Sequence, residues 1–189
     1  MKLFLFDLET TGTDAVKHGI HQLAGKIIID GDVKECFNFK MRPKEGAVYD
    51  PAALQVGNVT EEQLRAYPPM HEVFAQVIRM LDKYVDKYDK NDKFFLVGYN
   101  NAAFDDIMFR QWFTDNGHKY FGSYFWSAAL DCIVLAMAAL AEKRHMMANF
   151  KQSTVAAALG VSVDADKLHD ASYDIELCHA IYDKVCGKY

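Results

Sequence analysis

Apolar residues near the start of the chain fall into short continuous runs that predict strands. The run at 3–6, Leu-Phe-Leu-Phe, is typical of a strand buried on both faces and central in a sheet. Two more strands are predicted at 21–30 and 35–41, and the Asp-Gly-Asp turn at 30–32 predicts that they form a hairpin. A further buried strand is predicted at 94–99. These segments predict the strands of one sheet.

Helical periodicity dominates the rest of the chain. The clearest amphipathic helix is predicted at 70–88, where apolar residues recur every three or four positions. The segment 43–60, which contains proline and glycine, is predicted to be a loop, and Thr60 begins a capped helical turn. Further helices are predicted at 104–115, 132–143, 151–159 and 172–185. Early strands followed by strands alternating with helices predict a mixed α/β sheet with helices packed on it.

Composition narrows the compartment and the class of partner. The four cysteines are scattered without a Cys-x-x-Cys pair, which argues against a zinc site or a disulfide framework and favours a cytoplasmic protein. The longest apolar stretch, 133–141, is too short to span a bilayer, so no membrane association is expected. A formal net charge of −5 argues against a long basic groove for duplex nucleic acid. Any nucleic-acid contact is expected to be local, with metal ions supplying positive charge.

Two acidic residues follow the first apolar run, where burial disfavours charge. Asp7 and Glu9 come just before a Thr-Thr-Gly turn. Residues two apart on a strand point the same way, so both carboxylates would project side by side from the strand end. Like charges partly out of water repel each other unless a cation lies between them, and a divalent metal is the usual one. In the alternative interpretation the strand ends earlier and both acids are solvated turn residues.

Two later acids head the apolar stripes of predicted helices. Asp105 shares a helix face with Phe109 and Trp112, although an ordinary acid in a first helical turn is also favoured by the helix dipole. Asp174 likewise heads the apolar stripe of the last predicted helix. His169 lies five residues before Asp174, on the loop that enters this helix, where a lone histidine is more often a surface residue.

In combination these residues resemble the motifs of a known family, the DEDDh exonucleases. These are relatives of the proofreading epsilon subunit of bacterial DNA polymerase, within the ribonuclease H-like superfamily. The first family motif, Asp-x-Glu-Thr-x-Gly, is matched by Asp7, Glu9, Thr10 and Gly12. The second, Asn-x-x-Phe-Asp, is matched by Asn101, Phe104 and Asp105. The third, His-x-Ala-x-x-Asp, is matched by His169, Ala171 and Asp174, and Asp131 is a weaker match between the second and third motifs.

The resemblance implies a fold and an activity. The expected fold is α/β and ribonuclease H-like, with a central mixed five-stranded sheet flanked by helices, as a single exonuclease domain over 1–189. The expected activity is metal-dependent 3′–5′ hydrolysis of phosphodiester bonds in single-stranded nucleic acid, with DNA favoured and 5′-mononucleotides released. The implied partners are single-stranded 3′ ends and a DNA polymerase or another replication or repair protein, as in DNA proofreading.

The resemblance also implies a role for each motif residue. Two divalent ions, Mg²⁺ or Mn²⁺, would be held by carboxylate oxygens, with Asp7 bridging both ions. The implied metal ligands are Asp7, Glu9, Asp105 and Asp174. His169 would take the proton from the attacking water. Thr10, Asn101 and Phe104 would contact the terminal nucleotide, although Phe104 is equally suited to the core.

Three positions refine this interpretation. Asp170 stands where a sister subgroup carries a tyrosine, which indicates the histidine form of the family. Tyr99 stands where many relatives have a histidine, and the loop at 54–60 lacks the histidine that many relatives place before its glycine. Both departures are expected to alter substrate contacts. The aromatic cluster at 120–126 suits either base stacking or core packing, with core packing favoured.

Two other classes of protein fit the sequence less well. Haloacid dehalogenase-type phosphatases also begin with acid-x-acid at a strand end, but they need aspartate where this chain has Glu9. A non-catalytic nucleic-acid-binding module would be expected to have lost one of the five motif residues, and all five are present. Within the family, DNA proofreading and the trimming of RNA or short oligonucleotides remain open alternatives. The chain ends soon after the last predicted helix, so no tail for docking a polymerase is expected.

Overall fold

A five-stranded mixed sheet forms the centre of the computed structural model, which describes residues 1–168 and 171–187. The strand order is β3-β2-β1-β4-β5. The strands are β1 (Lys2–Thr10), β2 (Ile20–Ile29), β3 (Asp32–Lys40), β4 (Phe95–Gly98) and β5 (Leu130–Asp131). β2 runs antiparallel to both β1 and β3, whereas β4 is parallel to β1 and β5 is parallel to β4. The predicted fold class and the central position of the first strand are confirmed.

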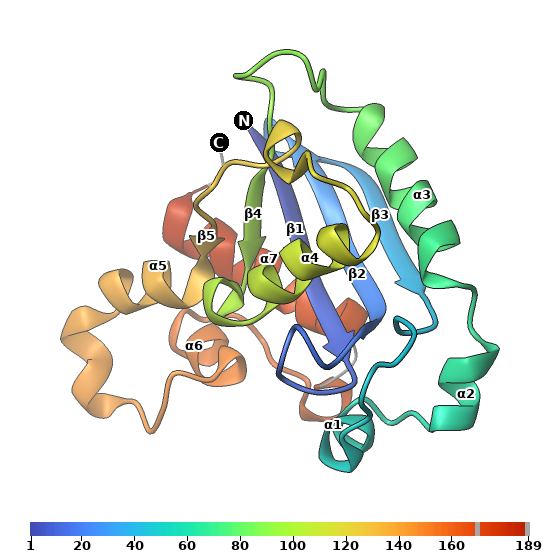
Figure 1. Ribbon diagram of the computed structural model, residues 1–189. Helices are drawn as coiled ribbons and strands as arrows, with labels where there is room; N and C mark the ends of the chain where they lie inside the picture. Colours follow the sequence, from blue (N-terminus) through green and yellow to red (C-terminus); the bar gives the residue numbers. More distant parts are fainter. Residues whose placement is uncertain (169–170, 188–189) are drawn as a thin grey trace.

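Helices cover both faces of this sheet (Figure 1). α3 (Met70–Asp82) and α4 (Asp105–Asp115) lie on one face, and α7 (Ala171–Cys186) lies on the other. The remaining α-helices are α1 (Pro51–Val56), α2 (Glu61–Ala66), α5 (Cys132–Ala139) and α6 (Gln152–Ala158). Four 3₁₀ turns are η1 (Asn101–Ala103), η2 (Phe121–Ser123), η3 (Ala141–Met146) and η4 (Ala165–Lys167). In the described part of the chain, no helix combines the length and the apolar character needed to cross a membrane.

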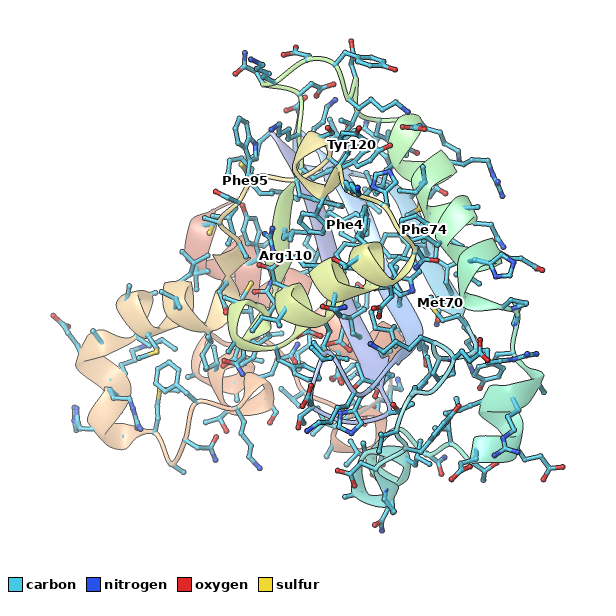
Figure 2. All side chains as sticks on the ribbon, in the orientation of Figure 1. Phe4, Met70, Phe74, Phe95, Arg110 and Tyr120 are labelled. Atoms are coloured by element: carbon cyan, nitrogen blue, oxygen red, sulfur yellow. The ribbon has the colours of Figure 1, made fainter. Side chains whose placement is uncertain are left out.

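Alternate residues of β1 contribute to two separate hydrophobic cores. One face meets an aromatic layer under α3 and α4, in which Phe4 stacks on Phe37 with ring centroids 5.0 Å apart. Figure 2 shows Phe4 and Phe74 inside this layer. The opposite face packs against α5 and α7 through smaller side chains. Tyr124 and Phe125 are buried in the aromatic layer, in agreement with core packing, whereas Tyr120 is 69% exposed near the end of the sheet where β1 begins (Figure 2).

The structure corrects two predicted boundaries. The predicted loop at 43–60 contains helix α1, because Asp50 caps it by accepting the Ala52 N–H and Pro51 occupies its first turn. The helix predicted at 70–88 ends at Asp82. Beyond it the chain turns, where the Asp92 carboxylate accepts the backbone N–H of Asp86. Side-chain hydrogen bonds to the backbone thus begin α1 and hold the turn that follows α3.

Candidate active site

Asp7 and Glu9 lie on the face of β1 that is covered by α7, since residues two apart on a strand point to the same side. They follow the apolar residues at the start of the strand on the same face. This face of β1 therefore changes from apolar to acidic along the strand. Both side chains are partly buried. Burial raises the pKa of Asp7 well above its usual range, and repulsion from the carboxylates of Asp105, Glu9 and Asp174 raises it further.

Asp105 is the first residue of α4 and is 7% exposed. Its Oδ1 accepts a hydrogen bond at 3.2 Å from the backbone N–H of Leu8, the residue between Asp7 and Glu9. This bond ties the start of α4 to the middle of the acidic motif on β1. Burial raises the pKa of Asp105 to about 7, despite hydrogen bonds from backbone N–H groups that lower it, and the Glu9 carboxylate adds to the rise.

Asp174 lies in the first turn of α7. Its backbone is fixed by the side chain of Gln152 on α6, whose amide donates to the Asp174 carbonyl oxygen at 2.7 Å. Burial raises the pKa of Glu9 to about 7, and the nearby Asp174 carboxylate contributes through repulsion. Asp174 acts on Asp7 in the same way. The last helix therefore completes the acidic group that begins on the first strand.

The three elements β1, α4 and α7 thus bring together four carboxylates that repel one another. These are Asp7, Glu9, Asp105 and Asp174. Within 1–168 and 171–187, no three Asp, Glu, His or Cys side chains already form a closed metal-binding cluster. The donor set is made entirely of carboxylate oxygens, which suit hard divalent cations such as Mg²⁺ and Mn²⁺.

Hydroxyl groups hold the turn that follows β1. Thr10 donates to the carbonyl oxygen of Gly12 at 2.8 Å, and the Thr11 hydroxyl accepts the Gly19 N–H at 3.0 Å. Gly12 lets the His18 ring approach the backbone, since a Cβ at this position would lie 2.4 Å from the ring. The Thr10 hydroxyl is therefore engaged within the turn, and its contact with a nucleotide remains a prediction.

Asn101 is fully buried in η1, and neither polar atom of its side chain has a hydrogen-bond partner among the described residues. It packs beneath Gly98, where an added Cβ would come within 2.7 Å of the Asn101 Cβ. An unpartnered buried amide costs about 1–3 kcal/mol, so this amide has unused capacity for a ligand. Phe104 is half-buried and packs against the aromatic core.

Asp131 braces the turn that leads into Asp105. Its Oδ1 accepts the N–H groups of Asn100 at 2.8 Å and Ile133 at 3.1 Å, and its Oδ2 accepts the N–H of Ala102 at 3.1 Å. One carboxylate therefore joins η1 to the start of α5. An aspartate before a helix signals an N-cap. Its bonds to a turn 29 and 31 residues earlier leave no local pattern in the sequence.

His21 is a buried neighbour of Glu9 that the sequence does not single out. The pairing of β1 with β2 shifts register just after Glu9, which leaves His21 as the extra residue of a β-bulge. The side chain is buried and both ring nitrogens lack hydrogen-bond partners in the described chain. Burial, together with the charge of Lys40, lowers the pKa of His21 to about 4. A Cβ on Gly57 would lie 3.4 Å from His21 Nε2 and 3.5 Å from Glu9 Oε2, so a neutral imidazole borders the same space as Glu9.

The proposed proton acceptor, His169, lies outside the described residues, as does Asp170. The loop toward them ends with η4, and α7 begins at Ala171. The other histidine of this region, His179, lies on α7 with its Nε2 3.7 Å from Asp183 Oδ1 and is partly exposed, as its helix position predicts.

Known proteins resemble this chain in sequence and in fold. A family model described as RNase_T exonuclease matches residues 4–182. The DNA polymerase III PolC-type of Mycoplasmopsis pulmonis (strain UAB CTIP) is 22% identical over 178 residues, which cover 94% of this chain and 11% of that protein. E. coli exonuclease I in complex with a dA16 oligonucleotide aligns with a TM-score of 0.75 and 21% identity, over 99% of this chain and 41% of that chain.

The chain therefore spans about two fifths of exonuclease I and about a tenth of the polymerase. The structural likeness agrees in fold, with the same mixed sheet flanked by helices. The family match runs from β1 to α7, the elements that carry the first and last acidic residues. The protein belongs to the RNase_T exonuclease family.

Proposed function

We propose that this chain is a metal-dependent 3′–5′ exonuclease domain, spanning 1–189, that acts on single-stranded nucleic acid. It releases 5′-mononucleotides one at a time, with DNA favoured over RNA. The observation that carries this proposal is the group of carboxylates from β1, α4 and α7 whose pKa values are raised by burial and mutual repulsion. Strongly perturbed carboxylates that gather from distant parts of a chain are typical of functional sites.

The residues fit a pair of divalent ions, Mg²⁺ or Mn²⁺. Asp7, Glu9, Asp105 and Asp174 would hold them, and cations would relieve the repulsion that raises these pKa values. When bound, such ions supply positive charge beside the attacking water and the leaving 3′-oxygen. The protein itself keeps the carboxylates in place through the Asp105–Leu8 bond.

The remaining motif residues handle the proton and the terminal nucleotide. His169 accepts the proton of the attacking water, a contribution of about 10²–10⁴-fold in general base catalysis. The buried amide of Asn101 offers unused donors and an acceptor, and Phe104 adds an apolar surface beside it. Thr10 contacts the same nucleotide from the turn after β1.

DNA is the favoured substrate because the relatives of this chain described above are associated with DNA. The matched protein in Mycoplasmopsis pulmonis is a DNA polymerase, and exonuclease I was solved with DNA oligonucleotides. A replication or repair protein is the corresponding partner, and the cytoplasm is the corresponding compartment. Trimming of RNA or short oligonucleotides is the alternative within the family.

The test follows a 5′-labelled single-stranded DNA with Mg²⁺ and a matched RNA of the same sequence. We expect a ladder that shortens from the 3′ end, faster on DNA, with loss of activity in EDTA and recovery on adding Mg²⁺ or Mn²⁺. Shortening from the 5′ end, efficient cutting of a closed circle, or activity that survives thorough chelation would refute the proposal.

The assignment of the base is tested by a pair of histidine variants. His169→Ala should lose most of the turnover, by about 10²-fold or more, because a general base is removed. His179→Ala, on the same stretch of chain but paired with Asp183, should keep the wild-type rate. The reverse result would exchange the two roles.

A further inference from the structure

A groove lies next to Asp174, on the side of the site formed by α6. It is a cavity of about 690 Å³ between the end of β4 and α6. Its lining includes Tyr99, Asn100, Phe150, Lys151 and Asp174. This volume lies within the range of about 300–1,000 Å³ that is typical of small-ligand pockets. The groove is therefore continuous with the acidic site and large enough for part of a nucleic-acid chain.

Two aromatic residues form its apolar walls. The Tyr99 hydroxyl donates to the backbone carbonyl of Phe150, which links the end of β4 to the segment before α6. The guanidinium carbon of Arg144 lies 5.2 Å from the centre of the Phe150 ring, a cation–π contact. Arg144 also donates to the carbonyl oxygen of Met147 at 2.9 Å. Phe150 is thus held between partners while part of its side chain remains accessible.

The segment beside the groove is basic although the chain as a whole is acidic. Residues 141–151 contain Lys143, Arg144 and Lys151 but a single acid, Glu142, whereas the chain carries a net charge of −5. Lys151 is exposed at the groove and has no ion-pair partner among residues 1–168 and 171–187. An exposed lysine beside a partly exposed aromatic ring is the combination that grips single strands, with the cation on a phosphate and the ring on a base.

We propose that this groove holds the part of the single strand on the 5′ side of the scissile phosphate. Lys151 binds a backbone phosphate there, and the Phe150 ring stacks against a base. The inference rests on the proposed exonuclease function, because it takes the scissile phosphate to lie at the four carboxylates. Thr10 and η1 take the terminal nucleotide, so the rest of the strand leaves past Asp174. In Figure 1, α6 lies on one side of β4 and η1, and the turn after β1 lies on the opposite side of them.

Tyr99 gains a role in this arrangement. Its hydroxyl positions Phe150 through the bond to the Phe150 carbonyl. An acidic peptide would meet the same lysine, but it would make no use of an aromatic surface beside it. The two kinds of ligand therefore differ in their dependence on the Phe150 ring.

The experiment measures binding of fluorescein-labelled dT8, and of an eight-residue abasic strand, with Ca²⁺ replacing Mg²⁺ to prevent cleavage. Lys151→Gln should weaken both ligands and lower the slope of log affinity against log salt by about 1, since one phosphate contact is lost. Phe150→Leu keeps an apolar side chain but removes the ring, so it should weaken dT8 about tenfold more than the abasic strand. Lys90→Gln, on the exposed loop before β4, is the matched charge control and should bind like wild type.

Four results would overturn the proposal. They are absence of dT8 binding by the wild type, wild-type affinity and salt slope in Lys151→Gln, equal losses for both strands in Phe150→Leu, and displacement of dT8 by octaglutamate as effective as by unlabelled dT8. Thermal unfolding of each variant shows that the fold is intact. Groove-dependent binding without cleavage in Mg²⁺ would refute the proposed function and still support the groove, so the two failures are distinguishable.

Discussion

The two faces of β1 carry different kinds of side chain along the same nine residues. Side chains on the α3 and α4 face stay apolar through the middle of the strand, namely Phe4, Phe6 and Leu8. Those on the α7 face change halfway from apolar to acidic, from Leu3 and Leu5 to Asp7 and Glu9. The first face packs among aromatic rings, and the second ends in carboxylates whose pKa values are raised.

This difference separates stability from chemistry. The aromatic face supplies apolar burial, which favours the folded chain. The acidic face opposes folding at neutral pH, because a raised carboxylate pKa means that the folded protein disfavours the charged form. The electrostatic repulsion within the site is relieved only when a cation binds or a carboxylate is protonated. Substitutions on the two faces should therefore have opposite effects on stability and on activity.

The largest expected effect is that of Asp7→Asn on catalysis. Nuclease activity should fall by at least about 10²–10³-fold, the loss typical of removing one charge-stabilising group from an active site. The metal-free variant should nevertheless melt at a higher temperature than the wild type, because a buried charge that repels its neighbours is gone. Calorimetry in EDTA and end-labelled cleavage in Mg²⁺ measure the two effects. Glu62→Gln, an exposed acid on α2, controls for the loss of one charge; a lower melting temperature for Asp7→Asn would contradict the comparison.

Phe4→Ala probes the other face. The ring is fully buried and stacks on Phe37 and Phe109. Its loss should lower the free energy of unfolding by about 3–5 kcal/mol, as measured by urea denaturation. Activity per folded molecule should stay close to that of the wild type, since the deleted ring lies on the opposite face of β1 from Asp7 and Glu9. Phe4→Leu serves if the alanine variant does not fold, and a loss of activity without a loss of stability would break the comparison.

Asp131→Asn tests the brace between η1 and α5. The asparagine keeps one acceptor oxygen but turns an NH₂ group toward a backbone N–H that now donates to the carboxylate. The free energy of unfolding should fall by about 1.5–3 kcal/mol, the range for hydrogen bonds to charged groups. Activity should fall as well, because η1 leads into Asp105. If denaturation and cleavage are both unchanged, the brace does not position Asp105.

The smallest expected effect is a pH dependence of the metal-free protein. Glu9 and Asp105 titrate near pH 7 in the folded chain, well above their usual pKa values. Between pH 4.5 and 7 the folded state therefore binds more protons than the unfolded state, and this contribution to stability falls as the pH rises. Glu9→Gln should show a shallower fall than the wild type when melting temperatures in EDTA are compared from pH 5 to pH 8. If the melting temperatures of both proteins fall equally with pH, the acidic face does not govern the pH dependence of stability.

Much of the fold follows from local sequence patterns. The apolar run at 3–6 predicts the central strand, and the capping box at Thr60 is present as expected. The strand β5 has only two residues, too few for a pattern of alternation to show. Helix α1 is missed because proline and glycine on either side of it suggest a loop, although Asp50 and Pro51 supply the start signals of a helix.

The site is predictable only in part, for a different reason. The carboxylates are visible because acids at the ends of apolar stripes conflict with burial, as at Asp105. His21 lies in a segment whose pattern is that of an ordinary strand. The β-bulge at this position brings it next to Glu9. Asp131 and the groove at Phe150 depend on contacts between distant segments, which no local spacing records.

The position of Asp174 on the last helix also matters during synthesis of the protein. Domains tend to fold from the amino terminus as the chain emerges, so β1 and its acids are made long before α7. A nascent chain that stops short of α7 carries three of the four carboxylates but lacks Asp174. On the proposed function, hydrolysis would therefore begin only after α7 has docked on the sheet.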